Sequence, residues 1–152
     1  MDLKILAHTM EYRGEAVTSP VNLRNYQDSD YEIYKKSYEA CFHEMRAALQ
    51  LTPVDCCAKR ENLLRKCEDV FVYEKDGRFI GSVAIYQNEI DDLFVAEEHQ
   101  KKGYGRQLLW FAVSYLQQKH CSPILLHVAD WNQEAVELYR KNGFVITKTE
   151  YV

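Results

Sequence analysis

The segment from residue 88 to residue 130 constrains the fold more than any other part of the chain. It begins with the apolar run NEIDDLFV, passes through the polar loop AEEHQKK into an apolar helical pattern from Gly103 to about Lys119, and ends with SPILLHVAD, typical of a buried strand. A strand–helix–strand unit of this kind places its two strands in parallel with a right-handed crossover. Ligands of such sheets bind beyond the carboxyl ends of the parallel strands, where this loop lies.

The remaining patterns add antiparallel strands and further helices around this unit. The run DVFVYEKDGRFIGSVAIY at 69–86 predicts a hairpin with an Asp-Gly turn, and the strand at 88–95 follows it directly. Apolar periodicity predicts a strand at 21–27, helices at about 30–51, 54–66 and 131–143, and a last strand at 144–152. The sequence therefore predicts an α/β (α+β) fold, with a mixed, mostly antiparallel central sheet flanked by helices.

Composition narrows the classes of protein to which the chain could belong. Its 152 residues suit one domain, and a formal net charge of -4 with a pI near 5.7 gives no global electrostatic case for nucleic acid. The N-terminus lacks the pattern of a signal peptide, and the longest apolar stretch, around 108–116, is too short to span a membrane. Five cysteines without a C-x-x-C pair predict free thiols in a reducing, cytoplasmic setting and no metal site.

Two of the six glycines of the chain stand directly in front of the apolar helix, in Gly103-Tyr104-Gly105. Glycines at a helix N-terminus allow backbone N–H groups to approach phosphate oxygens, and the basic residues Lys101, Lys102 and Arg106 surround them. A tight structural turn at Gly103 is the alternative interpretation. The Gly-Lys-Ser/Thr of a Walker loop is absent, and Leu108 stands where a dinucleotide fingerprint would need its third glycine.

The pattern is Gln-x-x-Gly-x-Gly, from Gln100 to Gly105, which resembles the coenzyme A pyrophosphate loop of the GNAT superfamily of N-acetyltransferases. IDDLFVAEEHQKKGYGRQLL is similar to the family's strand–loop–helix motif, and LLHVADWNQEAVELYRKNGF to its second motif. The resemblance implies one GNAT-like domain over 1–152 that binds acetyl-CoA in a cleft between splayed parallel strands. It implies acetyl transfer to a primary amine of a small molecule or protein, by direct attack in a ternary complex. The alternative is a non-catalytic CoA-binding sensor or scaffold module.

The same resemblance assigns candidate cofactor-binding residues. Backbone groups at the end of strand 88–95 would bind the pantetheine arm, with the amide of Val95 polarising the thioester carbonyl. Asn132 is either a helix cap or a contact to the coenzyme, and the two roles can coexist. The full set is Leu93, Phe94, Val95, Gln100, Lys101, Lys102, Gly103, Tyr104, Gly105, Arg106 and Asn132.

Acetyl transfer to an ammonium group also needs a base to remove its proton and an acid to protonate the leaving thiolate. Tyr139, on the apolar face of helix 131–143, would be the acid, with core packing as the alternative. Among the carboxylates of strand 88–95, we expect Asp91 and then Asp92 as the base, with solvated strand residues as the alternative. Leu93 and Val95 differ in parity from Ile90, which predicts a β-bulge in this strand or a strand buried on both faces.

One departure from the family pattern concerns the ends of the domain. The chain stops one strand after Gly143-Phe144, where GNAT domains usually have two, and about twenty residues precede the strand at 21–27. We expect this extension, residues 1–20, to form a possible extra strand. It, or a neighbouring subunit in a possible homodimer, would cover the exposed sheet edge.

Overall fold

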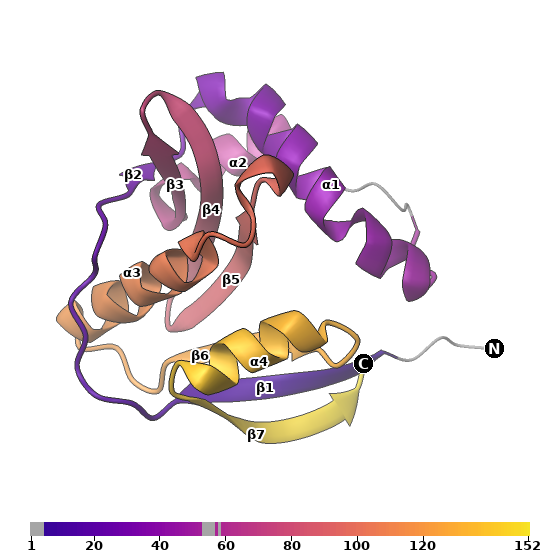
Figure 1. Ribbon diagram of the computed structural model, residues 1–152, viewed down its shortest axis with the longest axis vertical. Coiled ribbons are helices and arrows are strands. Elements are labelled where there is room, and N and C mark those ends of the chain that lie inside the picture. The colour runs from indigo at the N-terminus through magenta and orange to yellow at the C-terminus, as the bar shows by residue number, and fades with distance from the viewer. Residues whose placement is uncertain (1–4, 53–56, 58) are drawn as a thin grey trace.

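A computed structural model describes residues 5–52, 57 and 59–152 of the chain (Figure 1). Its centre is a seven-stranded sheet in the order β2-β3-β4-β5-β6-β1-β7, in which only β5 and β6 are parallel. The expected fold class is therefore confirmed. The strands are β1 Leu6–Tyr12, β2 Arg24–Asn25, β3 Val70–Lys75, β4 Arg78–Tyr86, β5 Glu89–Val95, β6 Leu125–Ala129 and β7 Phe144–Tyr151. The helices are α1 Tyr31–Ala48, α2 Arg60–Arg65, α3 Tyr104–Gln118 and α4 Gln133–Lys141.

Two hydrophobic cores lie on the two faces of the sheet. The larger one joins the sheet to α3 and α4 and includes Leu108, Leu116 and Val136. The smaller one lies under α1 and α2 and is mainly aromatic, with Tyr34 meeting Phe94 edge to face at a centroid distance of 5.2 Å. No helix among the described residues is long and apolar enough to cross a membrane.

The predicted hairpin of β3 and β4 is confirmed. Asp76 and Gly77 connect the strands, and both have left-handed backbone angles, with φ of 53° and 73°. Two consecutive residues with positive φ are typical of a type I′ turn, whose twist matches that of the strands. The strand predicted at 21–27 is shorter than expected, because only Arg24 and Asn25 pair with β3.

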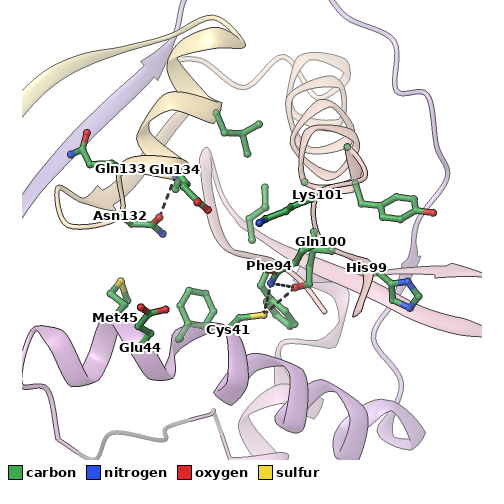
Figure 2. Close-up of a pocket in the computed structure, with 18 of the residues that line it drawn as sticks. Cys41, Glu44, Met45, Phe94, His99, Gln100, Lys101, Asn132, Gln133 and Glu134 are labelled. Atoms are coloured by element: carbon green, nitrogen blue, oxygen red, sulfur yellow. Dashed lines mark hydrogen bonds between the residues drawn. The ribbon is translucent and has the colours of Figure 1, made fainter. Parts of the chain in front are cut away.

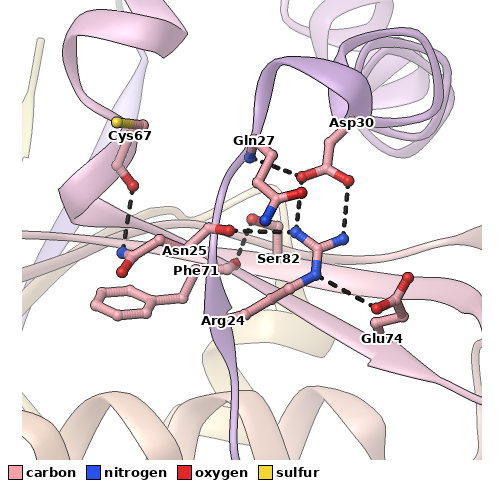
Figure 3. A network of polar contacts seen from close by, with 8 residues as sticks. All are labelled: Arg24, Asn25, Gln27, Asp30, Cys67, Phe71, Glu74 and Ser82. Carbon is pink, nitrogen blue, oxygen red and sulfur yellow. Dashed lines mark hydrogen bonds and ion pairs between the residues drawn. The ribbon is translucent and has the colours of Figure 1, made fainter.

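A polar network around Asp30 fixes the start of α1 beside β2 (Figure 3). The guanidinium of Arg24 donates to both carboxylate oxygens of Asp30, each at 2.8 Å, and the Gln27 backbone N–H donates to one of them, also at 2.8 Å. Asp30 is 7% exposed. Burial alone would raise the pKa of Asp30, but the hydrogen bonds from Arg24 and Gln27 hold it below its ordinary value. The carboxylate therefore stays charged and holds the start of α1 beside β2.

The N-terminal segment does form an extra strand, but it does not cover the outer edge of the sheet. Instead, β1 lies between β6 and β7 and pairs antiparallel with both. Met10 of β1 is completely buried in the larger core. Among the described residues β7 itself forms this edge of the sheet, so the expectation that the N-terminal segment covers it is wrong.

Candidate functional site

The site begins where the two parallel strands separate. β5 pairs with β6 at only two positions, Glu89 with Leu125 and Ile90 with Leu126. Beyond Ile90, β5 continues to Val95 and β6 to Ala129 without a further pairing. The expected splayed pair is thus confirmed, and a cleft opens between the carboxyl ends of the two strands.

A β-bulge bends β5 away from its parallel neighbour. Three residue steps along β5, from Asp91 to Phe94, oppose two along β4, from Ala84 to Ser82. The extra residue lies at Asp92, whose φ of 45° is unusual for a residue with a side chain. The predicted bulge is confirmed. Extra residues of this kind re-aim neighbouring side chains, so the bulge determines where both aspartates point.

Gly81 of β4 makes room for the bulged strand, a role that sequence reasoning missed. A Cβ at this position would collide with the Phe94 carbonyl oxygen and would lie 3.1 Å from both Val95 Cα and Leu108 Cδ1. Two of these neighbours are backbone atoms of β5, which cannot rotate away as a side chain would. A glycine inside a strand often marks such a close approach, and that was the available signal.

The cleft has a volume of about 600 Å³ and is bounded by α1, the end of β5, the N-terminus of α3 and the N-terminus of α4 (Figure 2). Asn132, which precedes α4, and Glu134 of α4 lie on one side, and Glu44 and Met45 of α1 on the other. Nine of the predicted cofactor-binding residues line it: Leu93, Phe94, Val95, Gln100, Lys101, Gly103, Tyr104, Gly105 and Asn132. Two others, Lys102 and Arg106, are exposed and are not among the lining residues.

The glycine loop ends at the first turn of α3. Gly103 is the N-cap residue of that helix, with a φ of 86°, and Lys101 before it has a φ of 63°. A Cβ at Gly105 would touch only Leu138 and Val95, at 3.7 and 3.9 Å, so this position lies between the two walls of the cleft. The unpartnered N–H groups of a helix N-terminus attract anions. This end of the cleft is therefore suited to phosphate groups.

Gln100 and Cys41 together hold the carbonyl group of Val95 at the end of β5. The Gln100 amide donates to this oxygen at 2.9 Å, and the Cys41 thiol donates to it at 3.0 Å. Burial, followed by the negative charge of Glu97, raises the pKa of Cys41 to about 11. The thiol is therefore protonated at neutral pH and is no nucleophile. Helical spacing in the sequence predicted α1, but not that Cys41 and Phe42 would face the cleft.

The two aspartates of the bulge have different surroundings. Asp91 is exposed, and its Oδ1 accepts a hydrogen bond from the Asp92 backbone N–H at 2.8 Å. Asp92 turns toward α1, where the Tyr38 hydroxyl lies 3.4 Å from its Oδ1. Burial is the main reason why the pKa of Asp92 rises to about 6, and the charge of Asp91 adds to it. The hydrogen bond from Tyr38 and the charge of Lys66 act in the opposite direction.

Tyr139 lies on the inner face of α4. Its ring packs against Phe144 at a centroid distance of 6.0 Å, and Ala135 and Leu138 on the same helix line the cleft. Burial raises the pKa of Tyr139 to about 12, and the negative charge of Asp91 contributes. The phenol is thus protonated at neutral pH and lies within electrostatic reach of the bulge.

Asn132 caps α4, with its side-chain oxygen accepting from the Ala135 N–H at 3.2 Å, and it also lines the cleft. The two alternatives considered for this residue, cap and cleft contact, are therefore compatible. Trp131 lies beside it in the cleft wall and is 43% exposed.

His127 of β6 is not among the cleft-lining residues. Its ring contacts Thr9 Oγ1 at 3.1 Å and Glu89 Oε1 at 3.5 Å on the exposed face of the sheet. The part of the chain that the structure describes contains no group of three or more His, Cys, Asp or Glu side chains that could hold a metal ion.

Comparison with known proteins identifies the family. The model of the Acetyltransferase (GNAT) family matches residues 26–144. Streptothricin acetyltransferase A of Bacillus subtilis (strain 168) is 32% identical over 81 residues, which cover 50% of this chain and 47% of that protein. Thialysine N-epsilon-acetyltransferase of Sus scrofa is 33% identical over 54 residues, covering 36% and 32% of the two chains. The chain thus spans less than half the length of these two curated relatives.

Solved structures share the fold at low sequence identity. An acetyltransferase of the GNAT family from Colwellia psychrerythraea has a TM-score of 0.72 at 11% identity, covering 97% of this chain and 55% of its own. The structure of yncA from Salmonella typhimurium, solved with its cofactor acetyl-CoA, has a TM-score of 0.64 at 19% identity and covers 84% and 80%. Because the family model matches more than half of the sequence, the chain belongs to the acetyltransferase (GNAT) family.

Proposed function

We propose that this member of the GNAT family transfers an acetyl group from acetyl-CoA to a primary amine. The observation that carries the proposal is the separation of β5 from β6 beyond Ile90, which opens the cleft beside a helix N-terminus that carries two glycines. The curated relatives are named as acetyltransferases, and yncA was solved with acetyl-CoA. Both facts support the same chemistry for this chain.

The residues of the cleft fit a coenzyme that joins phosphate groups to an extended amide arm. Lys101, Gly103 and Gly105 form an open, cationic end suited to phosphates. At the other end, the Ala96 N–H donates to the Ile80 carbonyl of β4. Since successive residues of a strand alternate in direction, the Val95 N–H points away from β4. Bound here, acetyl-CoA would supply an acetyl group activated as a thioester, and the Val95 N–H would polarise its carbonyl oxygen.

Asp92 is the better candidate for the base than Asp91, which reverses the preference derived from the sequence. An amine that is protonated in solution must lose a proton before it can attack. A carboxyl with a pKa of about 6 is mostly ionised at neutral pH and is a stronger base than an ordinary aspartate. The exposed Asp91 would assist, because its charge raises the pKa of Asp92 and would attract the ammonium form of the acceptor.

Tyr139 would deliver the proton that the leaving sulfur needs. With a pKa of about 12, its hydroxyl carries a proton over the whole physiological range. Neither side chain is among the residues that line the cleft, so base and acid would act from behind its two sides, Asp92 on β5 and Tyr139 on α4. The acceptor is a primary amine of a small molecule or of a protein. The cytoplasmic location and the homodimer stay predictions.

The test measures thiol release from acetyl-CoA with a panel of amines, for wild type, Tyr139→Phe and the matched control Tyr73→Phe. The control also removes one tyrosine hydroxyl, which in wild type donates to the Gln107 side chain at 2.8 Å. We expect turnover with at least one amine, a loss of about 100-fold or more in Tyr139→Phe, and little change in the control. Tight CoA binding without turnover on a broad panel would instead support the non-catalytic sensor or scaffold.

A further inference from the structure

A buried histidine of the N-terminal strand bridges two other parts of the fold. His8 of β1 is 7% exposed. Its Nε2 lies 2.7 Å from Asp130 Oδ1, and its Nδ1 lies 2.8 Å from Thr149 Oγ1 of β7. A carboxylate can only accept hydrogen bonds, so Nε2 donates to Asp130. A neutral imidazole with its proton on Nε2 then accepts from the Thr149 hydroxyl, and both ring nitrogens are satisfied.

Asp130 stands at the corner where β6 turns into α4. Its backbone N–H donates to the Leu6 carbonyl of β1 at 2.9 Å. The next two residues, Trp131 and Asn132, line the cleft, whereas Asp130 is not among the lining residues. The Asn132 N–H donates to the Ala129 carbonyl at 3.0 Å, closing a tight turn around Asp130. Whatever holds the Asp130 side chain therefore also holds the peptide that presents Trp131 and Asn132.

We propose that His8 is a positioning residue for the wall of the cleft formed by Trp131 and Asn132. Through Asp130 it would fix the corner between β6 and α4, and so the affinity of the cleft for coenzyme A. Asp130 is 43% exposed at its side chain, and in water an aspartate at such a corner has several rotamers. The charge-assisted bond to a buried imidazole, at 2.7 Å, selects one of them, and a longer hydrogen bond of 3.3 Å from the exposed Gln133 amide to the same Oδ1 supports it. The coenzyme part of this inference rests on the proposed function.

Two isosteric replacements separate the two bonds of the ring. The amide nitrogen of glutamine reaches the place of Nε2, so His8→Gln can keep the bond to Asp130. Asparagine reaches only the place of Nδ1, so His8→Asn can keep the contact with Thr149 but not that with Asp130. Both place a neutral amide in the same buried position, which makes their general cost to stability comparable. Thr149→Val is a further control, because it removes only the contact with β7.

Two measurements test the proposal in a Trp110→Phe background, where Trp131 is the one remaining tryptophan of the two in the chain. The first is acrylamide quenching of Trp131 in the ligand-free protein, and the second is equilibrium binding of coenzyme A. We expect His8→Asn to change the quenching constant and to raise the dissociation constant roughly tenfold, the effect of losing one hydrogen bond to a charged group. His8→Gln and Thr149→Val should stay within about twofold of the parent protein.

Equal behaviour of His8→Asn and His8→Gln in both measurements would overturn the proposal. If His8 had only a structural role, the two similar amides would be expected to disturb the protein to the same extent. A change in Thr149→Val as large as that in His8→Asn would also overturn it. Should the parent protein bind no coenzyme A, the proposed function fails. The quenching comparison, which needs no ligand, then decides by itself whether His8 positions the corner.

Discussion

The strands on the two sides of the cleft are assembled in different ways. On one side, β3, β4 and β5 follow one another along the chain and pair as antiparallel neighbours. On the other side, β6 pairs with β1 and β1 pairs with β7, and the contact between His8 and Thr149 connects residues 141 positions apart. The two sides pair with each other at only two positions, Glu89 with Leu125 and Ile90 with Leu126.

This difference matters for function because each side contributes a different part of the site. The locally assembled side carries the bulge and the partly buried Asp92, which are unfavourable features that need rigid neighbours. The side that contains β1, β6 and β7 carries Asn132, the N-cap residue of α4, and Tyr139 of α4. Each group of strands is held together by its own pairing, so the cleft between β5 and β6 can stay open without destabilising either group. Substitutions in the two halves should therefore have separable effects.

The largest effect should come from Asp92→Asn, on the bulged side. Turnover should fall by about 100- to 1000-fold because the proposed base is lost. Stability should change in the opposite direction. The folded pKa of about 6 lies above the roughly 3.9 of an unfolded aspartate, so the ionised carboxyl destabilises the fold above pH 6. That cost disappears as the pH falls from about 6 to about 4.

The variant should therefore be more stable than wild type at pH 8, by on the order of 1 to 3 kcal/mol, and the gain should shrink toward pH 4. Steady-state rates and urea unfolding at the two pH values measure both effects. A variant with normal turnover would show that the base lies elsewhere, even if its stability rises as expected.

The next substitution tests the close contact between Gly81 of β4 and the bulged strand β5. Gly81→Ala should destabilise the protein by about 3 kcal/mol, because the new Cβ meets backbone atoms of β5. The matched control is Gly77→Ala in the hairpin turn, where φ is 73° and a Cβ would meet nothing within 4 Å. That change should cost only about 1 kcal/mol of backbone strain. Denaturant unfolding compares them, and equal losses would mean that β5 can shift to accommodate the methyl group.

A third substitution addresses the other half. Met10→Ala removes a completely buried side chain of β1 and should cost about 2 to 4 kcal/mol. Leu64→Ala on α2, where the side chain is 43% exposed, should cost less than about 1 kcal/mol. Thermal unfolding of both variants checks whether β1 is as firmly integrated as the central strands. A negligible loss for Met10→Ala would show that β1 is only loosely attached.

The smallest effect concerns the electrostatic contact between the two aspartates. The rate should fall below about pH 6 as Asp92 becomes protonated. In Asp91→Asn this fall should occur at a lower pH, by less than about one unit. Glu89→Gln is the control, since Glu89 is not among the charges that shift the pKa of Asp92. pH–rate profiles of wild type and the two variants measure this shift. If the fall in rate occurs at the same pH in Asp91→Asn as in wild type, a group other than Asp92 causes it.

The sequence allowed the locally assembled half to be predicted well, for a physical reason. Turn chemistry at Asp76-Gly77 and alternating apolar residues act over a few positions, so they can be read directly. The phase change between Ile90 and Leu93 predicted the bulge in the same way. The loop from Gln100 to Gly105 could be placed at the end of a parallel strand because crossovers are right-handed.

In the other half, β6, α4 and β7 were also predicted, but the place of β1 could not be derived in the same way. Nothing in the run LAHTMEY says that it pairs between β6 and β7, because that register depends on partners more than 100 residues away. The preference for Asp92 over Asp91 as the proposed base also required the structure. The pKa of Asp92 is raised mainly by its burial, which outweighs the opposing hydrogen bond from Tyr38 of α1. Neither effect is a local property of the strand.

The position of β1 has a consequence for biosynthesis. A ribosome makes residues 6–12 more than 100 residues before their partner strands at 125–129 and 144–151. Until then the growing chain carries an unpaired strand whose Met10 has no core to enter. The hairpin of β3 and β4 can meanwhile form from adjacent segments. The wall of the cleft around Asn132 therefore cannot be assembled on β1 until the segment at 125–151 has been made.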